Sequence, residues 1–387
     1  MTAKRILVPF GTRPEVIKLA PVVAALREYG HTVLAVDTGQ HTVAAMAGDV
    51  QRDLGLRPDI RRSLPEPAQD GGSRLGALLE GADEVLRSNP VDLVLALGDT
   101  HTVPAYALAS RAAGVPFAHL EAGLRSFNPR SLEEVNRRVA AATAQLHFAP
   151  TGRAAGFLAG EGVDADRIFI VGNPVIDALR RRGITPVPPA DRTGVLVTAH
   201  RASNVDDPER LARLIGVVAR LADIGPVRFP VHPRTGARLR EHGLAERLAA
   251  VPGVTCEDPL AYDDLLRELA TSRVVVTDSG GLQEEASYLG VPVVVLRRST
   301  PRWEGVETGT AVLTGISTDE EADRAVAAAH RLSAPLMLAH IAALPCPYGD
   351  GNTGPRVAEL LADPIMDTLL ALDEPDYTAG PLPWAVA

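Results

Sequence analysis

The chain has 387 residues, of which 46% are hydrophobic and 22% are charged, and its 48 acidic and 39 basic residues give a net charge of −9. A chain of this length has more residues than one hydrophobic core ordinarily holds, which predicts two domains. The acidic balance argues against a nucleic-acid partner, and the lack of an apolar run of about 18 residues argues against a membrane-spanning segment.

The first half of the chain alternates short apolar stretches with stretches of helical periodicity. Strands are predicted at residues 5–10, 32–37, 92–97, 116–119 and 145–149, with helices between them. This alternation is typical of a parallel sheet covered by helices on both faces.

A glycine turn follows the first predicted strand. The segment Gly11-Thr12-Arg13-Pro14-Glu15 leads into an apolar helix. Arg13 could clamp a diphosphate with two hydrogen bonds, which a lysine would do less well. The turn has neither the glycine spacing of a dinucleotide site nor the Gly-Lys-Ser/Thr ending of a P-loop, so the pattern indicates neither ligand.

Carboxylates follow two neighbouring predicted strands. Asp99 comes after strand 92–97, and Glu121 comes after strand 116–119. The two could perform acid/base chemistry if both point into one cleft. The alternatives are a helix N-cap for Asp99 and a surface or salt-bridged position for Glu121. Glu133 begins a later helix, where the helix dipole alone would favour an acidic residue.

The second half of the chain repeats the plan of the first. A linker is predicted at 180–189, where prolines and charges break the helical pattern. Strands are then predicted at residues 194–198, 227–231, 274–277, 292–296 and 311–314. We expect two doubly wound, Rossmann-like α/β domains facing each other across a cleft, at residues 1–178 and 190–350. A last helix at about 355–372 could pack back on the first domain.

The segment Ser279-Gly280-Gly281 follows an apolar strand and opens a helix. Glycines let the backbone approach a ligand, and the N–H groups of a first helical turn attract anions, so the segment predicts a phosphate site. Glu284 and Glu285 would repel a phosphate, so at least one should face a hydroxyl-bearing group such as ribose. Together these features indicate a nucleotide; a structural turn without ligand is the alternative.

Two histidines end strands of the second half. His200 and His232 each follow a predicted strand. A neutral imidazole can donate to a phosphate or act as a base, although a lone histidine is more often structural. No Gly-x-Ser-x-Gly elbow is present, so Ser279 is better interpreted as a phosphate donor than as a nucleophile.

The cysteines and histidines do not indicate a metal site. The chain has two cysteines, Cys256 and Cys346, and its histidines are scattered. Neither set has metal-ligand spacing. With so few cysteines and no leader before Arg5, we expect a reduced, cytoplasmic setting.

Together, the motifs resemble those of the non-hydrolysing UDP-N-acetylglucosamine (UDP-GlcNAc) 2-epimerases. They occur in order from residue 6 to about 360, and so many motifs in one order do not arise by chance. The motifs lie at residues 11–15 with Lys18, 38–41, 98–100, 119–125, 133–137, 172–177, 200–201, 230–233, 278–285 and 347–351.

This resemblance implies a GT-B fold, a homodimer, no nicotinamide or other cofactor, and interconversion of UDP-GlcNAc with UDP-N-acetylmannosamine (UDP-ManNAc). It implies that the catalytic residues are Asp99, Glu121, Glu133 and His200. It implies that the substrate is bound by Arg13, Lys18, Gln40, His41, Arg137, His232, Ser279, Gly280, Gly281, Glu285 and Arg302.

Three other functions share many of these features. A hydrolysing epimerase would release free ManNAc and UDP, because water need only intercept the reaction at C1. A GT-B glycosyltransferase would use a UDP-sugar with an acceptor. A nucleotide-sugar sensor would bind without catalysis.

The chain departs from the family pattern in several places. Leu265 stands where members often place a phenylalanine near uracil, and Pro301 and Trp303 replace the family's residues in a loop that could shift substrate identity.

Val43 replaces a glutamine of the allosterically activated members. Valine cannot supply the hydrogen bonds of an amide, which should weaken a second UDP-GlcNAc site about tenfold or more. We therefore expect turnover of UDP-ManNAc alone to begin without a lag. Progress curves with and without a trace of UDP-GlcNAc test this, and a lag abolished by the trace would contradict it.

Overall fold

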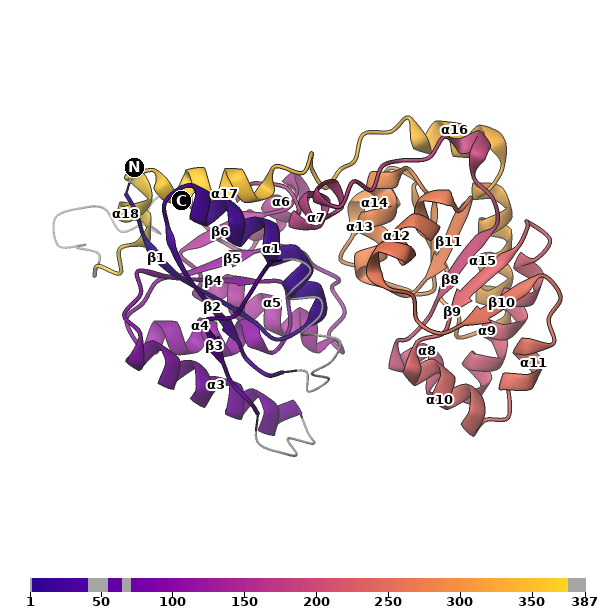
Figure 1. Cartoon of the computed structure of the whole chain (residues 1–387), viewed down its shortest axis with the longest axis horizontal. Coiled ribbons are helices and arrows are strands. Elements are labelled where there is room, and N and C mark those ends of the chain that lie inside the picture. Colours follow the sequence, from indigo (N-terminus) through magenta and orange to yellow (C-terminus); the bar gives the residue numbers. More distant parts are fainter. Residues whose placement is uncertain (1, 41–54, 65–70, 375–387) are drawn as a thin grey trace, which may run out of the picture.

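The computed structural model describes residues 2–40, 55–64 and 71–374, which form two α/β domains (Figure 1). The first contains a seven-stranded parallel sheet in the order β3-β2-β1-β4-β5-β6-β7. Its strands are β1 (Arg5–Phe10), β2 (Thr32–Asp37), β3 (Ile60–Arg61), β4 (Leu93–Leu97), β5 (Phe117–Leu120), β6 (Leu146–Ala149) and β7 (Ile168–Ile170).

The second domain repeats this order with six parallel strands, β10-β9-β8-β11-β12-β13. Its strands are β8 (Val195–Thr198), β9 (Val227–Pro230), β10 (Val254–Glu257), β11 (Val274–Thr277), β12 (Val293–Val295) and β13 (Ala311–Leu313). The two doubly wound sheets expected from the sequence are therefore confirmed. Strands β3, β7 and β10 were not predicted; each lies at the edge of its sheet or is largely unburied, which weakens the apolar signal.

Helices cover both sheets. Those of the first half are α1 (Arg13–Glu28), α3 (Gly71–Ser88), α4 (Thr102–Ala112), α5 (Leu132–Thr143), α6 (Gly152–Gly160) and α7 (Pro174–Arg181). Those that follow are α8 (Ala202–Val205), α9 (Pro208–Leu221), α10 (Pro233–Glu241), α11 (Ala245–Ala249), α12 (Tyr262–Thr271), α13 (Gly280–Leu289), α14 (Trp303–Glu307), α15 (Asp319–Leu332) and α16 (Pro335–Ala342).

Strand β1 is buried on both faces. Ile6 and Phe10 belong to the core cluster that includes α1, whereas Leu7 belongs to the cluster under α3 and α4. Alternate residues of a strand point to opposite faces, so a continuous apolar run is required where both faces are covered.

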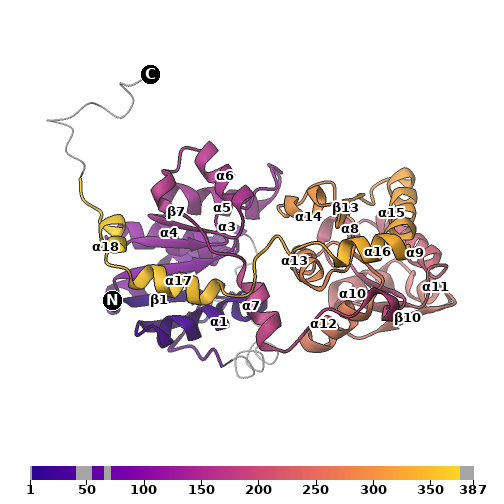
Figure 2. The same ribbon diagram turned by 90° about the horizontal axis from the view of Figure 1, so that it is seen from above.

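The C-terminal helices α17 (Thr353–Ala362) and α18 (Ile365–Leu370) return to the first domain, and Figure 2 shows α17 alongside α1. Val357 and Met366 join the core of that domain. A Cβ on Gly354 would lie 2.9 Å from the carbonyl oxygen of Pro21, so only glycine allows this close approach.

We propose that the domains span residues 1–178 and 190–350, with α17 and α18 added to the first. Helix α7 lies where they join, because Val175 and Leu179 pack with Leu196 and Val275 of the second domain while α7 also contacts α1. No helix in residues 2–40, 55–64 and 71–374 is long and apolar enough to cross a membrane.

Candidate functional site

The glycine turn after β1 binds a carboxylate of its own helix. Oε2 of Glu15 accepts hydrogen bonds from the amides of Gly11 (2.9 Å) and Thr12 (2.8 Å), and Oε1 accepts one from the Thr100 hydroxyl (2.7 Å). A Cβ on Gly11 would lie 2.3 Å from the Thr38 hydroxyl, so the turn needs glycine. Because Glu15 occupies these amides, any anion at this turn must be held by side chains.

Arg13 is the cation available there. The side chain is partly buried and makes no hydrogen bond or ion pair with any residue that the structure describes. Burial lowers the pKa of Arg13, and the neighbouring charged and polar groups Tyr262, Arg182 and Asp263 belong to the segment leading into the second domain and to α12. Arg13 therefore faces the other domain with its donors unused.

Two further predicted binding residues follow β2. Gln40 accepts hydrogen bonds through Oε1 from the Thr102 amide (3.2 Å) and hydroxyl (3.0 Å), and its side-chain amino group donates to no acceptor among the described residues. His41 and Val43 lie outside the described residues.

Lys18 lies between carboxylates of the two domains. Its Nζ is 2.5 Å from Oε1 of Glu121 and 3.0 Å from Oε2 of Glu284. Burial would lower the pKa of Lys18, but the two carboxylates outweigh burial and raise it, so the ammonium is charged. Arg302 completes the group, with Nε 2.8 Å from Oε1 of Glu284. All four charged side chains are buried.

Glu121 has a strained backbone. It follows β5 with φ of +64°, in the left-handed region that residues other than glycine rarely adopt. Such conformations persist where the surroundings hold them, often at functional sites. Glu121 is salt-bridged, as one of the alternatives proposed, but it is buried between the domains and does not lie on the surface.

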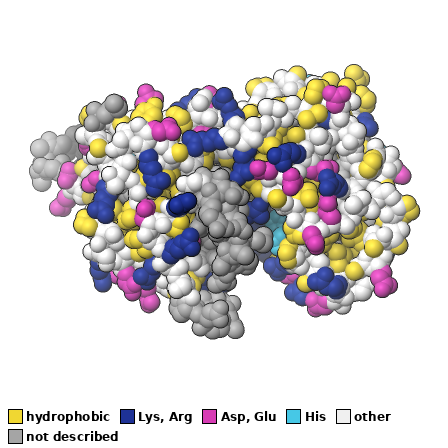
Figure 3. Space-filling model, viewed as in Figure 1, with side chains coloured by type: hydrophobic (Ala, Val, Ile, Leu, Met, Phe, Trp, Pro, Cys, Tyr) yellow, Lys and Arg dark blue, Asp and Glu magenta, His cyan; other side chains and the backbone are white. Residues whose placement is uncertain are grey.

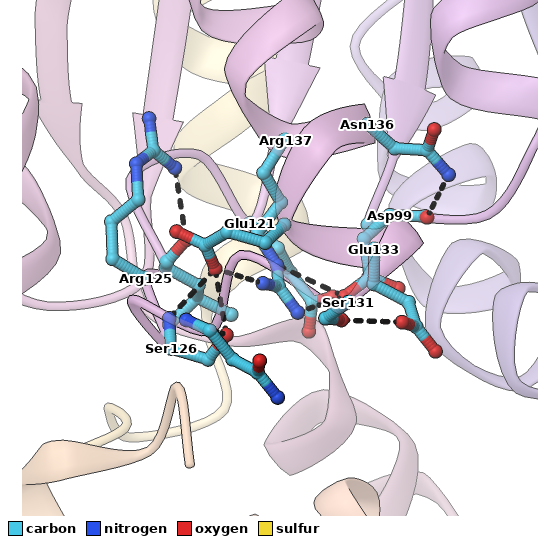
Figure 4. Close-up of polar contacts among 12 residues, drawn as sticks. Asp99, Glu121, Arg125, Ser126, Ser131, Glu133, Asn136 and Arg137 are labelled. Carbon is cyan, nitrogen blue, oxygen red and sulfur yellow. Dashed lines mark hydrogen bonds and ion pairs between the residues drawn. The ribbon is translucent and has the colours of Figure 1, made fainter. Parts of the chain in front are cut away.

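Asp99 is paired with Arg137. Its Oδ2 is 2.6 Å from Nη2 and 3.0 Å from Nε of Arg137, whose Nη1 binds Glu134 at 2.7 Å (Figure 4). Burial would raise the pKa of Asp99, but Arg137 and Arg302 outweigh burial and lower it. The N-cap alternative for Asp99 is wrong, because His101 precedes α4 in that position.

Glu133 lies at the start of α5, and its side chain is 41% exposed. Oε2 accepts a hydrogen bond from the Ser131 hydroxyl at 2.5 Å, as Figure 4 shows, and Oε1 is 3.5 Å from Nη1 of Arg201 in the second domain. Burial would raise the pKa of Glu133, but the Ser131 hydrogen bond and Arg201 lower it overall. The carboxylate is thus ionised and accessible.

The buried Asp278 orders the loop that carries His200. Its carboxylate accepts from the amides of His200 and Arg201 (2.9 Å to the latter), and its Oδ1 is 3.3 Å from Nδ1 of His200. The rings of His200 and His232 have centroids 5.3 Å apart. Burial lowers the pKa of both histidines, so both are mainly neutral at pH 7, and His200 is able to accept a proton. Nδ1 of His232 accepts a hydrogen bond from the Arg234 amide at 3.2 Å, so this ring presents Nε2–H as a donor.

The segment Ser279-Gly280-Gly281 begins α13. Ser279 is the N-cap residue, yet its side chain makes no capping hydrogen bond and is available to a ligand. The guanidinium of Arg302 lies against Gly280, where a Cβ would be 3.1 Å from Nη1. A serine hydroxyl, a helix N-terminus and an arginine therefore converge, as an anion site requires.

Glu285, further along α13, contacts the neighbouring helix α12. Its Oε1 accepts a hydrogen bond from the Tyr262 hydroxyl at 2.5 Å, and burial raises the pKa of Glu285 to about 7. The Arg182 guanidinium lies over the Tyr262 ring, 5.4 Å from its centroid. Leu265 is partly buried and packs against the same hydrophobic cluster as Tyr262.

Other side chains join the domains on the α14 side. Nε1 of Trp303 donates to the Arg125 carbonyl at 2.8 Å, and the Thr151 hydroxyl donates to Glu304. In the space-filling view, basic side chains lie on both sides of the boundary between the domains (Figure 3).

The structure thus gathers those predicted residues that it describes along the carboxyl ends of both sheets. Sequence reasoning missed Asn173, Arg201, Tyr262 and the role of Glu284 as a partner of Lys18. Asn173, Arg201 and Glu284 lie inside the family motifs at residues 172–177, 200–201 and 278–285, so only their long-range partners lacked a signal. In the described part of the chain, no cluster of histidine, cysteine and acidic side chains could hold a metal ion.

A family model described as UDP-N-acetylglucosamine 2-epimerase matches residues 24–362. The chain belongs to this family. The resemblance inferred from the motifs is confirmed, and the UDP-GlcNAc 2-epimerase family is one of isomerases.

Members of the family are similar to this chain over almost its whole length. A probable UDP-GlcNAc 2-epimerase of Ralstonia solanacearum is 38% identical and the match covers 92% of this chain and 98% of that protein. A UDP-2,3-diacetamido-2,3-dideoxy-D-glucuronate 2-epimerase of Pseudomonas aeruginosa is 35% identical, over 92% of this chain and 99% of that protein. The crystal structure of the Methanocaldococcus jannaschii UDP-GlcNAc 2-epimerase in complex with UDP-GlcNAc and UDP has a TM-score of 0.81 and 31% identity, over 92% of this chain and 99% of that chain. The fold is therefore of the GT-B type.

Proposed function

We propose that this chain interconverts UDP-GlcNAc and UDP-ManNAc without hydrolysis, by eliminating UDP to form a 2-acetamidoglucal and adding it back. The observation that carries the proposal is the contact of Lys18 with Glu121 and Glu284. This contact joins a carboxylate of the first domain to α13, the helix of the second domain whose N-terminus forms the anion site. Membership of the epimerase family supports the substrate and the reaction.

Elimination accounts for the residues present. The hydrogen on C2 of the sugar has no adjacent carbonyl to acidify it, so direct removal is implausible without oxidation. If the C1–O bond to UDP breaks while C2 loses its proton, the electrons of the C2–H bond form the C1–C2 double bond. Re-addition of UDP at C1, with a proton delivered to C2 from the opposite face, inverts C2.

We assign the leaving diphosphate to Arg13, Ser279 and the amides of Gly280 and Gly281, with Arg302 beside them. Fixed donors in a site of low dielectric stabilise developing charge by several kcal/mol, at about 3 kcal/mol for each donor. Lys18, Gln40, His41, Arg137 and His232 are proposed to bind and orient the rest of the substrate.

We propose that Asp99, Glu121 and Glu133 move the proton at C2 and stabilise the cationic sugar ring. His200 is proposed as a further catalytic residue. The neutral state expected of His200 allows it to accept a proton. The ionised state of Asp99 and Glu133 suits stabilisation of positive charge on the ring.

Deuterium exchange tests this function. The protein is incubated with UDP-GlcNAc in deuterated water and followed by NMR. Deuterium at C2 with formation of UDP-ManNAc supports the proposal. Free ManNAc and UDP would identify a hydrolysing enzyme, and unchanged UDP-GlcNAc would contradict epimerisation of this sugar. A parallel sample with the diacetamido-glucuronate nucleotide separates a different sugar specificity from inactivity.

Replacing Arg13 by alanine should weaken UDP binding by about 1.5 to 3 kcal/mol, the range for hydrogen bonds to a charged group. The guanidinium has no partner among the described residues, so its loss removes ligand contacts without leaving a protein acceptor unpaired. Isothermal calorimetry measures the change. Arg5→Ala is the matched control, because Arg5 is exposed at the start of β1. Equal dissociation constants for the Arg13 variant and the wild type would return Arg13 to a structural role.

Glu285 should make nucleotide-sugar binding depend on pH. Burial raises the pKa of Glu285 from 4.5 to about 7, so the free protein holds this group mainly protonated below pH 7 and ionised above it. Ribose hydroxyls donate to a carboxylate, so binding favours the ionised form. Affinity should therefore fall as pH drops below about 7, approaching tenfold per pH unit.

The measurement uses UDP-GlcNAc and the Glu121→Gln background, so that turnover does not interfere. UDP-GlcNAc is preferred to UDP because its diphosphate has no terminal phosphate that titrates in this range. Glu285→Gln is the control and should show a flatter profile. The same slope in both proteins would exclude Glu285 as the titrating group.

We also propose that the protein is a homodimer, as the family resemblance implies, and that it is cytoplasmic. Both cysteines are free thiols, which fits a reducing compartment. Light scattering on the purified protein measures the oligomeric state.

A further inference from the structure

Glu284 is the acidic side chain on which both domains converge. It is fully buried on α13 of the second domain. Oε2 accepts from Nζ of Lys18 at 3.0 Å, and Oε1 accepts from Nδ2 of Asn173 at 3.1 Å and from Nε of Arg302 at 2.8 Å. One carboxylate thus ties helix α1, the residue before α7 and the segment before α14 together.

Lys18 and Asn173 also donate hydrogen bonds to Glu121. Nζ of Lys18 is 2.5 Å, and Nδ2 of Asn173 is 2.8 Å, from Oε1 of Glu121. Lys18 and Asn173 therefore each bridge the carboxylates of Glu121 and Glu284, and the four side chains form a closed ring of hydrogen bonds. Because two donors fix one oxygen of Glu121, its orientation depends on where those donors are held.

Stability alone does not account for this arrangement. Lys18 and Arg302 carry two positive charges, and Glu121 and Glu284 carry two negative charges, all in buried positions. Removing four charges from water costs as much as or more than their attraction returns, and apolar side chains would pack there at least as stably. A balanced, buried set at a domain boundary is instead what a site needs to fix a charged group precisely.

We infer that Glu284 is a positioning residue for the reaction: contact between the domains brings it onto Lys18 and Asn173, and these two then orient Glu121. This inference rests on the proposed function, in which Glu121 acts on the sugar. The negative charge of Glu284 also offsets Lys18 and Arg302, and so reduces the attraction of the site for a diphosphate.

Two consequences of opposite sign follow from replacing Glu284 by glutamine. Turnover should fall between about tenfold and a hundredfold, the scale for a displacement of a catalytic group by about 1 Å. Binding of UDP should stay within about threefold or become tighter, because the variant leaves Lys18 and Arg302 facing one carboxylate fewer. A general loss of folding would instead weaken both, so the pair of measurements is specific.

Asn173→Ser is the second variant. Oδ1 of Asn173 caps α7 by accepting from the Val175 amide at 3.0 Å. Serine caps helices about as well, so this variant removes the bridging amide and keeps the cap. Turnover should fall by about tenfold with unchanged UDP affinity, and this variant decides the question if Glu284→Gln does not fold. Glu359→Gln, at an exposed position on α17, is the control for loss of a glutamate.

The experiment measures kcat and KM by C2 deuterium exchange and UDP affinity by calorimetry on each full-length variant. A fall in kcat with unchanged or tighter UDP binding supports the inference. Turnover within threefold of the wild type, or a parallel loss of kcat and UDP affinity, overturns it. The wild type is measured first, and its failure to exchange the hydrogen on C2 would contradict the proposed function. If the wild type is active, the differences between the variants and the wild type test the role of Glu284.

Discussion

Replacing Glu121 by glutamine is expected to lower turnover at least about a hundredfold while UDP affinity changes little. Glutamine has the same shape and still accepts from Lys18 and Asn173, but it can neither hold the C2 proton nor present a full negative charge to the ring. The buried position and left-handed backbone of Glu121 hold this carboxylate in a fixed place in the site. Steady-state rates of C2 exchange measure the effect.

Asp99→Asn and Glu133→Gln are expected to lower turnover on the same scale. Their environments differ, since Asp99 is clamped by Arg137, whereas Glu133 is part-exposed with Arg201 3.5 Å away. Glu80→Gln, on the exposed face of α3, serves as the control. Full activity in any one of the three variants removes that residue from the mechanism, and calorimetry with UDP verifies that each variant retains a folded nucleotide site.

The strand ends of this fold were predictable because apolar runs bounded by glycine turns are local signals. Strands β4 and β11 are buried along their whole length, and β1 is buried at every position after the exposed Arg5, so their sequences are apolar at nearly every position. Parallel strands end at one edge, and this rule placed Asp99, Glu121 and His200 at the carboxyl ends of β4, β5 and β8.

The partners of these residues were not predictable from local pattern. Lys18 contacts Glu284 across 266 positions of sequence, and Arg137 contacts Asp99 across 38. The first contact depends on how α1 meets α13 when the two domains pack, and the second on how α5 packs within the first domain; no periodicity or spacing records either arrangement. The glycine turn at β1 shows the same limit, because the sequence favours an anion site there but Glu15 itself binds the amides.

Replacing Lys18 by methionine should lower the free energy of unfolding by about 3 to 5 kcal/mol, the cost of removing one partner from a buried ion pair. Methionine fills a similar volume, so the loss is electrostatic. Glu284 would keep Arg302 and Asn173, but Glu121 would keep only the neutral Asn173 amide at its paired oxygen. The source of the penalty is a buried carboxylate that has no cation within hydrogen-bonding distance and keeps only the longer-range attraction of Arg302.

The chain provides its own control, because its only other lysine is also buried. The side chain of Lys4 is 5% exposed, against 8% for Lys18, but its carboxylate partner Asp367 is 50% exposed and can be solvated when the lysine is lost. Lys4→Met should therefore cost no more than about 2 kcal/mol, including its hydrogen bond to the Leu361 carbonyl. Urea denaturation of both variants measures the difference, and equal losses would contradict the electrostatic account.

The double variant Lys18→Met/Glu121→Gln sharpens the test. Removing the unpaired charge together with its cation should restore part of the stability that Lys18→Met alone loses, because the neutral amide of glutamine costs less to bury than a carboxylate. The double variant should thus be more stable than Lys18→Met although it carries one more substitution. If the two losses simply add, Lys18 and Glu121 do not interact in solution as they do in the structure, and the ring that links them to Glu284 would have no energetic basis.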